Sequence, residues 1–150
     1  MIHTGHESMI VRRSAALVIP LVQLFGLYVL FFGQYGPGGG FVGGVMLAAS
    51  LIAGILVFGP DGQPAATAKK LLKTDGLGLL IFAGVGGLCL IGGGAFLNYS
   101  SMQLPGLDDP TRRYLGIVLT QIGVAADIAV AAVSIVFSLY SASSNEVSDG

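Results

Sequence analysis

Asp127 is the residue of this sequence whose type and position most clearly suggest chemistry. It lies at the middle of an apolar stretch, residues 115–140, which exceeds the roughly 20 residues that a helix needs to cross a bilayer. Asp127 is about 18 Å along the helix axis from Leu115. A carboxylate at that depth costs about 2.5–3.5 kcal/mol on insertion scales, and such residues usually serve ion or proton movement. Asp127 is therefore the first candidate for a functional site.

Residues three or four positions away from Asp127 share its helix face. They form a stripe of small and polar side chains, whereas valine and isoleucine gather on the other faces, as contact with lipid requires. Asp127 is therefore expected to point into protein or into a water-filled crevice. Gln121 lies about 120° away around the helix, so we do not expect it to be the direct partner. The stripe consists of Gly116, Thr120, Gly123, Asp127, Ala131, Ser134 and Ser138.

The sequence offers no counter-ion for Asp127, because the central turns of the other apolar spans contain no Lys, Arg, His or Glu. Three explanations stay open: the carboxyl is protonated, it binds a cation, or it faces a basic group of another subunit. A protonated Asp127 that merely hydrogen-bonds a neighbouring helix is the structural alternative. Thr120, Ser134 and Gln23, which lies at the centre of the first span, are the further candidate ion-path residues. For Gln23, an ordinary interhelical hydrogen bond is the favoured interpretation over a transport role.

Composition places the chain among integral membrane proteins. Of its 150 residues, 53% are hydrophobic and 10% charged, and soluble domains carry about 25% charged residues. The net charge of −1 gives no indication of nucleic-acid binding. We predict an all-α protein with one domain, residues 14–140. It comprises four transmembrane helices at about 14–32, 41–58, 76–96 and 115–140, flanked by a cytoplasmic tail at 1–13 and a disordered cytoplasmic tail at 141–150.

A short glycine-rich turn, residues 33–40, is expected between the first two spans. Its glycines permit tight reversal of the chain. Gly40, Gly44 and Ala48 follow at intervals of four and form a small-residue face suited to close helix contact. The stretch lacks the Lys-Ser/Thr of a phosphate-binding loop and the strand that precedes a dinucleotide site, so nucleotide binding is excluded.

The connections predict where the remaining helices begin and end. Pro64 is suited to start a short interfacial helix whose lysines meet anionic headgroups. The glycines at 92–94 predict a distorted end of the third span, and Asp109-Pro110 predicts the start of the fourth helix. Five Lys and Arg residues flank the spans on the side of the termini, against two on the other, so we expect both termini in the cytoplasm.

Other reactive side chains give weaker signals. His3, His6 and Glu7 resemble a metal cluster, but three donors on a chain end favour a solvated tail. Cys89, the single cysteine, lies in an apolar run and is expected to be a small buried hydrophobe. No nucleophile-base pair, metal cluster or nucleotide fingerprint is present, so we expect neither an enzyme nor a cofactor.

Two segments resemble a known family. Residues 37–44, PGGGFVGG, are similar to the PGGGF-x-GG signature of the MnhB domain family, a type of subunit found in Mrp-type multisubunit cation/proton antiporters. Residues 126–130, ADIAV, resemble the family's FDIGV segment and make Asp127 its acidic residue. Ala126 and Ala129 depart from that pattern. Gln34-Tyr35 stands where the family often has His-Asn, so no histidine role is transferred.

The resemblance implies a non-catalytic subunit of an antiporter that exchanges cytoplasmic Na⁺ for external H⁺. It implies other Mrp subunits and the lipid bilayer as partners, in the cell membrane of a bacterium or archaeon, with Asp127 at or near the ion path and as a candidate Na⁺ ligand. A purely structural scaffold and a self-sufficient homodimeric transporter are the alternatives. The expected subunit or helix contacts are Pro37, Gly38, Gly39, Gly40, Phe41, Gly43 and Gly44.

Overall fold

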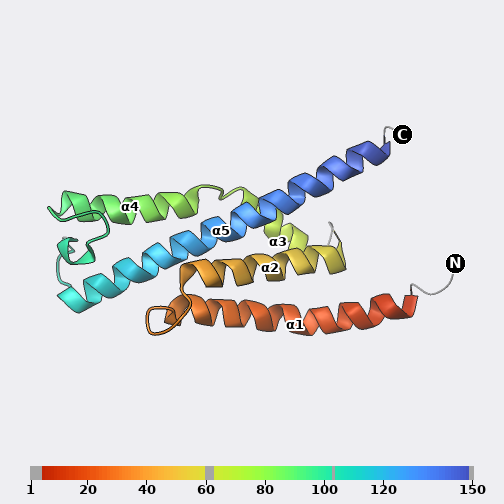
Figure 1. Ribbon diagram of the computed structural model, residues 1–150, viewed down its shortest axis with the longest axis horizontal. Helices are drawn as coiled ribbons and strands as arrows, with labels where there is room; N and C mark the ends of the chain where they lie inside the picture. The colour runs from red at the N-terminus through yellow and green to blue at the C-terminus, as the bar shows by residue number, and fades with distance from the viewer. Residues whose placement is uncertain (1–4, 60–62, 103, 149–150) are drawn as a thin grey trace.

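The computed structural model describes residues 5–59, 63–102 and 104–148, and these are helical with short connections (Figure 1). Three helices within the described chain are long and apolar enough to cross a membrane, and a shorter apolar helix of 15 residues joins them. The chain is therefore all-α, as expected for a four-span membrane protein. Its elements are α1 (Gly5–Phe32), α2 (Gly40–Phe58), α3 (Gln63–Leu72), α4 (Leu77–Ile91), η1 (Tyr99–Ser101) and α5 (Asp109–Ser148).

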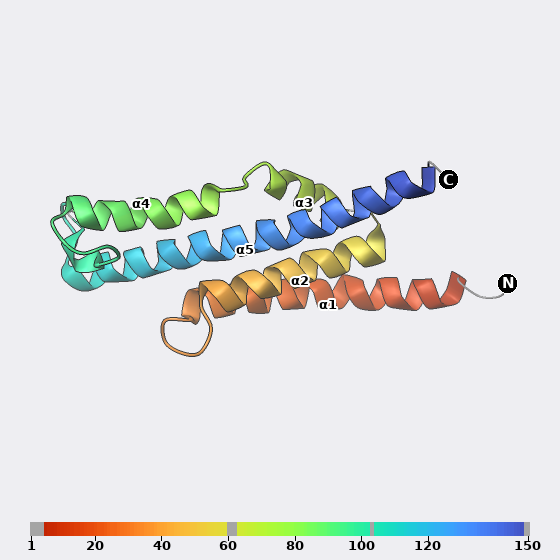
Figure 2. The same ribbon diagram turned by 45° about the horizontal axis from the view of Figure 1, so that its top comes forward.

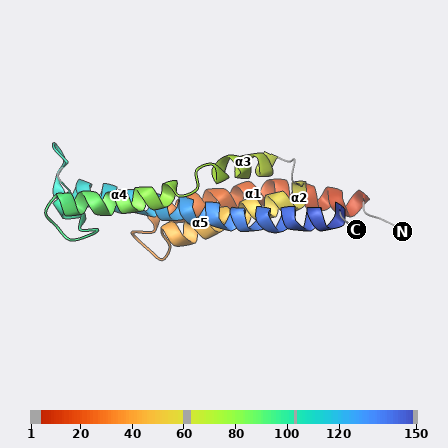
Figure 3. The same cartoon turned by 90° about the horizontal axis from the view of Figure 1, so that it is seen from above.

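Helix α5 is the axis on which the other helices pack. The α1–α2 hairpin covers the half of α5 nearer the C-terminus, whereas α4 covers the half nearer the start of α5 (Figures 1 and 2). Helix α3 lies beside α2 and α5, and Figure 3 shows it on one face of the bundle. The start of α1 and the end of α5 lie at the same end of the bundle. The two groups of helices are thus offset along α5.

Glycines set the close approach of α2 to its neighbours. A Cβ built on Gly44 would lie 2.8 Å from Ala125 Cα of α5, and one on Gly40 would collide with the backbone of Gln121. Gly43 faces the other way, where a Cβ would lie 2.9 Å from Leu30 Cβ of α1. Gly40 and Gly44 of the small-residue face predicted for the second span thus lie against the backbone of α5, as close helix packing requires.

Several helix ends agree with the predictions, and others differ. Helix α4 ends at Ile91, because Gly92 and Gly93 leave the helix, so it is shorter than the predicted span at 76–96. Helix α5 starts at Asp109 as expected, but it continues to Ser148. The tail predicted to be disordered is thus helical over residues 141–148, since nothing in its sequence interrupts the preceding helix. The predicted tail at 1–13 is likewise helical from Gly5.

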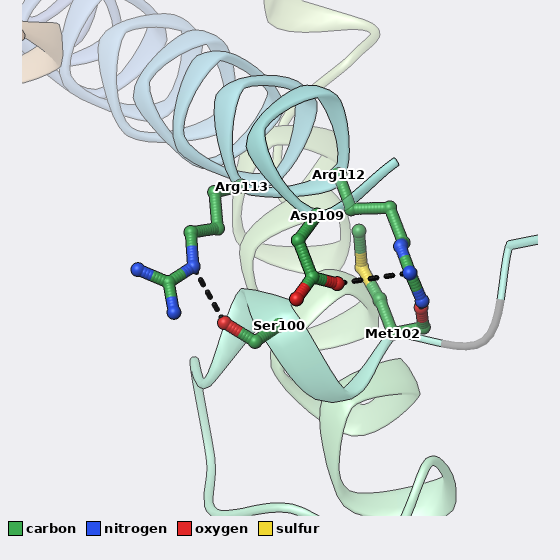
Figure 4. A network of polar contacts seen from close by, with 5 residues as sticks. All are labelled: Ser100, Met102, Asp109, Arg112 and Arg113. Carbon is green, nitrogen blue, oxygen red and sulfur yellow. Dashed lines mark hydrogen bonds and ion pairs between the residues drawn. The ribbon is translucent and has the colours of Figure 1, made fainter. Parts of the chain in front are cut away.

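The connection between α4 and α5 is fastened to the first turns of α5 (Figure 4). Arg113 Nε donates to Ser100 Oγ at 2.6 Å, and Arg112 Nη1 donates to the Met102 carbonyl at 3.3 Å. Arg112 also pairs with Asp109 at 2.9 Å. The metal cluster considered at His3, His6 and Glu7 lies outside the residues whose side chains the structure describes.

Candidate ion site around Asp127

Asp127 lies where α4 begins. A Cβ built on Gly78, the second residue of α4, would lie 2.7 Å from Asp127 N and 2.9 Å from Asp127 Cβ. A Cβ on Gly123 would in turn lie 2.8 Å from the Gly78 carbonyl oxygen. Two glycines on facing helices therefore let the backbones touch, and they bring the base of the Asp127 side chain against the N-terminal turn of α4.

The Asp127 side chain is half-buried and has no hydrogen-bond or ion-pair partner among the described residues. Both carboxylate oxygens are accessible at the surface of the chain, because neither belongs to the fully buried polar atoms that lack a hydrogen-bond partner. The N-terminus of a helix carries a partial positive charge. That end of α4 is a positive element that the fold brings against Asp127, and no pattern in the sequence indicates it.

The part of the stripe before Asp127 is covered, as predicted. The Tyr99 ring packs on Gly116, where a Cβ could not fit, and the Tyr99 hydroxyl donates to Thr120 Oγ1 at 3.2 Å. Thr120 itself donates to the Gly116 carbonyl at 2.7 Å. The Thr120 hydroxyl, a candidate for the ion path, is thus engaged in two hydrogen bonds: the one with Tyr99 holds the α4–α5 connection to α5, and the one with Gly116 lies within α5.

The part of the stripe after Asp127 is more open. Ala131 and Ser138 are exposed and Ser134 is half-buried. Leu72 of α3 packs instead against the buried cluster of Leu51, Ile55 and Val133, whose α5 member lies off the stripe. Asp127 therefore lies at the boundary between a covered and an open half of the stripe.

Gln23 lies across a groove from α5. The groove has a volume of about 340 Å³ and is mainly apolar. Gln23 of α1 and Thr74 of the α3–α4 turn are polar residues in its wall. Ala126, the residue before Asp127, also lines the groove. The structure thus places Gln23 near the Asp127 level of the bundle, on a different helix and without a direct contact to the carboxylate among the described residues.

The glycine-rich turn between α1 and α2 allows close packing within this chain. Gly38 and Gly39 have φ values of 156° and 92°, which favour glycine, and the Gly39 amide donates to the Val29 carbonyl at 3.2 Å. Gly39, Gly40, Gly43 and Gly44 are buried, whereas Pro37 and Phe41 are exposed. Of the residues predicted to make subunit contacts, the buried glycines contact α1 and α5, and Pro37 and Phe41 remain free to meet another molecule.

Sequence reasoning missed three residues that shape the site: Gly78, Tyr99 and Gln121. Gly78 stands at the start of an apolar span rich in glycine, and no local pattern distinguishes it from Gly84, which faces open space. Gln121 lies off the stripe and was not expected to be a partner of Asp127, yet its backbone and side chain contact Gly40 and Gly39. Only the register of one helix against another reveals such contacts.

Comparisons with known proteins give matches over most of the chain. The profile of the family described as "Domain related to MnhB subunit of Na+/H+ antiporter" matches residues 10–142. A B-type Na(+)/H(+) antiporter subunit of Alkalihalophilus pseudofirmus is 34% identical over 130 residues, which cover 81% of this chain and 90% of that protein. The corresponding antiporter subunit of Bacillus subtilis is 28% identical over 129 residues, with the same coverage of 81% and 90%.

The putative antiporter subunit mnhB2 of Staphylococcus haemolyticus is 29% identical over 132 residues, which cover 83% of this chain and 94% of that protein. No solved structure matches the chain. The family match extends over nearly the whole described bundle, from the first turns of α1 to the last part of α5. The chain belongs to the MnhB family of Na⁺/H⁺ antiporter subunits.

Proposed function

We propose that this chain is a non-catalytic membrane subunit of a multisubunit antiporter that exchanges cytoplasmic Na⁺ for external H⁺, with Asp127 at or beside the ion path. In this proposal both termini lie in the cytoplasm of a bacterial or archaeal cell. The relatives are named as antiporter subunits, which supports the assembly, and the partners are the other subunits of that antiporter.

The observation that carries the role of Asp127 is its isolation. It is half-buried in the longest helix, within the apolar segment, and has no hydrogen-bond or ion-pair partner among the described residues. Placing a carboxylate in a membrane span costs free energy, and such residues usually take part in the movement of ions or protons. Ser134 and Gln23 are polar groups of the same region, and Na⁺ prefers oxygen donors of this kind, as other hard cations do.

The test is Asp127→Asn in the assembled antiporter, because asparagine keeps the shape of the side chain and removes its charge. We expect Na⁺/H⁺ exchange in membrane vesicles to fall at least about tenfold, equivalent to about 1.4 kcal/mol in the barrier. Subunit co-purification should be unchanged. Asp109→Asn, a change in the same helix at a carboxylate that is 64% exposed, is the matched control. Unchanged exchange in Asp127→Asn would refute the role of this residue.

A scaffold role is the second candidate, and one observation favours it. Phe41 is 65% exposed although it belongs to the glycine-rich signature, four of whose glycines are buried. If Phe41 docks another subunit, Phe41→Ala should reduce co-purification of the complex, whereas Leu24→Ala, at an equally exposed apolar position of α1, should not. Loss of the complex in Phe41→Ala together with full exchange in Asp127→Asn would favour the scaffold.

A self-sufficient homodimeric transporter makes a different prediction. The isolated chain in proteoliposomes would exchange Na⁺ for H⁺ without other subunits. We expect no exchange from the isolated chain, and exchange sensitive to Asp127→Asn in that preparation would overturn the multisubunit proposal.

A further inference from the structure

Helix α3 and the turn after it lie beside the apolar helices and not beyond their ends. Leu72, the last residue of α3, packs against the buried cluster formed by Leu51 and Ile55 of α2 and Val133 of α5. Leu51 lies about 10 Å along the axis before α2 ends at Phe58. Thr74, in the following turn, lines the same groove as Leu47, which is about 16 Å from that end. Because α2 is long and apolar enough to span a membrane, this turn stands at membrane depth.

The surface of this segment is unsuited to lipid. Lys69 and Lys70 of α3, and Lys73 and Asp75 of the turn, are all exposed. Residues 73–76 are also not helical, and irregular backbone is tolerated at membrane depth only inside protein or beside water. Within the described chain, neither Lys73 nor Asp75 has an ion-pair partner. Separate charges of both signs are stabilised best by water.

The same turn leads to Asp127. Gly76 precedes α4 without a side-chain cap, and Gly78 contacts Asp127 directly. The carboxylate oxygens reach the surface of the chain, and Ala131, one helical turn further on the stripe, is exposed. The exposed charged residues and the break in the helix therefore lie within a few residues of the glycine that contacts Asp127.

We propose that the break between α3 and α4 lines a water-filled crevice through which protons and hydrated monovalent cations reach Asp127. Its mouth lies at the end of the bundle that holds the start of α1, the end of α2 and the end of α5 (Figures 1 and 2). The claim that the crevice leads to the ion path rests on the proposed function of Asp127. The claim that its surface is hydrated rests on the exposed charges and the break in the helix, and does not depend on that function.

The test is the reactivity of single cysteines in the assembled complex, in a Cys89→Ala background. Asp75→Cys and Ala131→Cys report the crevice, and Leu80→Cys, on a 68% exposed apolar position of α4, is the lipid-facing control. The probe is a cationic, membrane-impermeant methanethiosulfonate, applied to sealed vesicles of each orientation. Lys73→Cys replaces either reporter if that variant does not assemble.

We expect Asp75→Cys and Ala131→Cys to react at least about 100-fold faster than Leu80→Cys, because only a hydrated thiol ionises to the reactive thiolate. The fast reaction should occur in the orientation that presents the termini to the probe. Rates as slow as that of Leu80→Cys would overturn the proposal, whether lipid or another subunit covers the turn. Fast labelling combined with full Na⁺/H⁺ exchange in Asp127→Asn would support the crevice and refute the role of Asp127. The two proposals can therefore fail separately.

Discussion

Replacing Gly78 by alanine tests the contact that brings α4 to Asp127. The added methyl group would meet the Gly123 carbonyl, Asp127 N at 2.7 Å and Asp127 Cβ at 2.9 Å. The first two are backbone atoms of a long helix and cannot turn away, so α4 must move off α5. Overpacking of this kind typically costs about 1–3 kcal/mol.

Gly84→Ala is the matched control for this change. Gly84 lies in the same helix, and a Cβ there would meet nothing within 4 Å. Alanine is the better helix former by up to about 1 kcal/mol, so Gly84→Ala should be neutral or slightly stabilising. The two variants have the same chemistry and differ in the space around the new methyl group.

The measurement is equilibrium unfolding of the purified chain in mixed micelles of detergent and sodium dodecyl sulfate, followed by circular dichroism. We expect Gly78→Ala to lose about 1–3 kcal/mol, which is roughly a 5- to 150-fold change in the folded-to-unfolded ratio. Equal stability of Gly78→Ala and Gly84→Ala would show that α4 and α5 do not touch at Asp127, and it would refute the geometry described for the site.

Three other substitutions probe contacts elsewhere on α5. Tyr99→Phe should cost about 0.5–1.5 kcal/mol in the same assay, because it removes the hydrogen bond to Thr120 but keeps the ring; no change would mean that this bond is not formed. Asp109→Asn should cost less than about 1 kcal/mol, because its pair with Arg112 is largely exposed, and a larger loss would contradict this. Gly40→Ala should prevent stable accumulation of the chain, measured by immunoblot, because the methyl group would collide with the α5 backbone.

The long helices could be predicted from the sequence because each contains a long apolar run, and local end signals mark where several helices begin or end. Pro64 at the start of α3 and Gly92 at the end of α4 are such signals, and both helices end or begin there within two residues. The face of α2 that carries Gly44 was also predictable, since small residues at intervals of four permit close packing in a membrane.

The site could be predicted only in part. The stripe identified the side of Asp127 that meets protein, and the contacts of Gly116 and Gly123 confirm it for the half before Asp127. No local pattern indicates that α4 starts at the level of Asp127, or that the turn holding Thr74 lies beside the middle of α2. The register between two helices depends on how side chains from distant segments fit together. The hydrophobic periodicity of one helix therefore cannot predict that register.

Helix α5 also sets the order in which the chain can be completed during synthesis. The hairpin of α1 and α2 joins neighbours in sequence, so it can form as soon as both have left the ribosome. Gly40 and Gly44, by contrast, pack on Gln121 and Ala125, which are made about 80 residues later. Helix α4, shorter than the three long apolar helices, likewise gains its main packing partner from α5. Until the ribosome releases the 40 residues of α5, Gly40 and Gly44 have no α5 backbone to pack against, so the packing of α2 and α4 on their common partner follows the synthesis of α5.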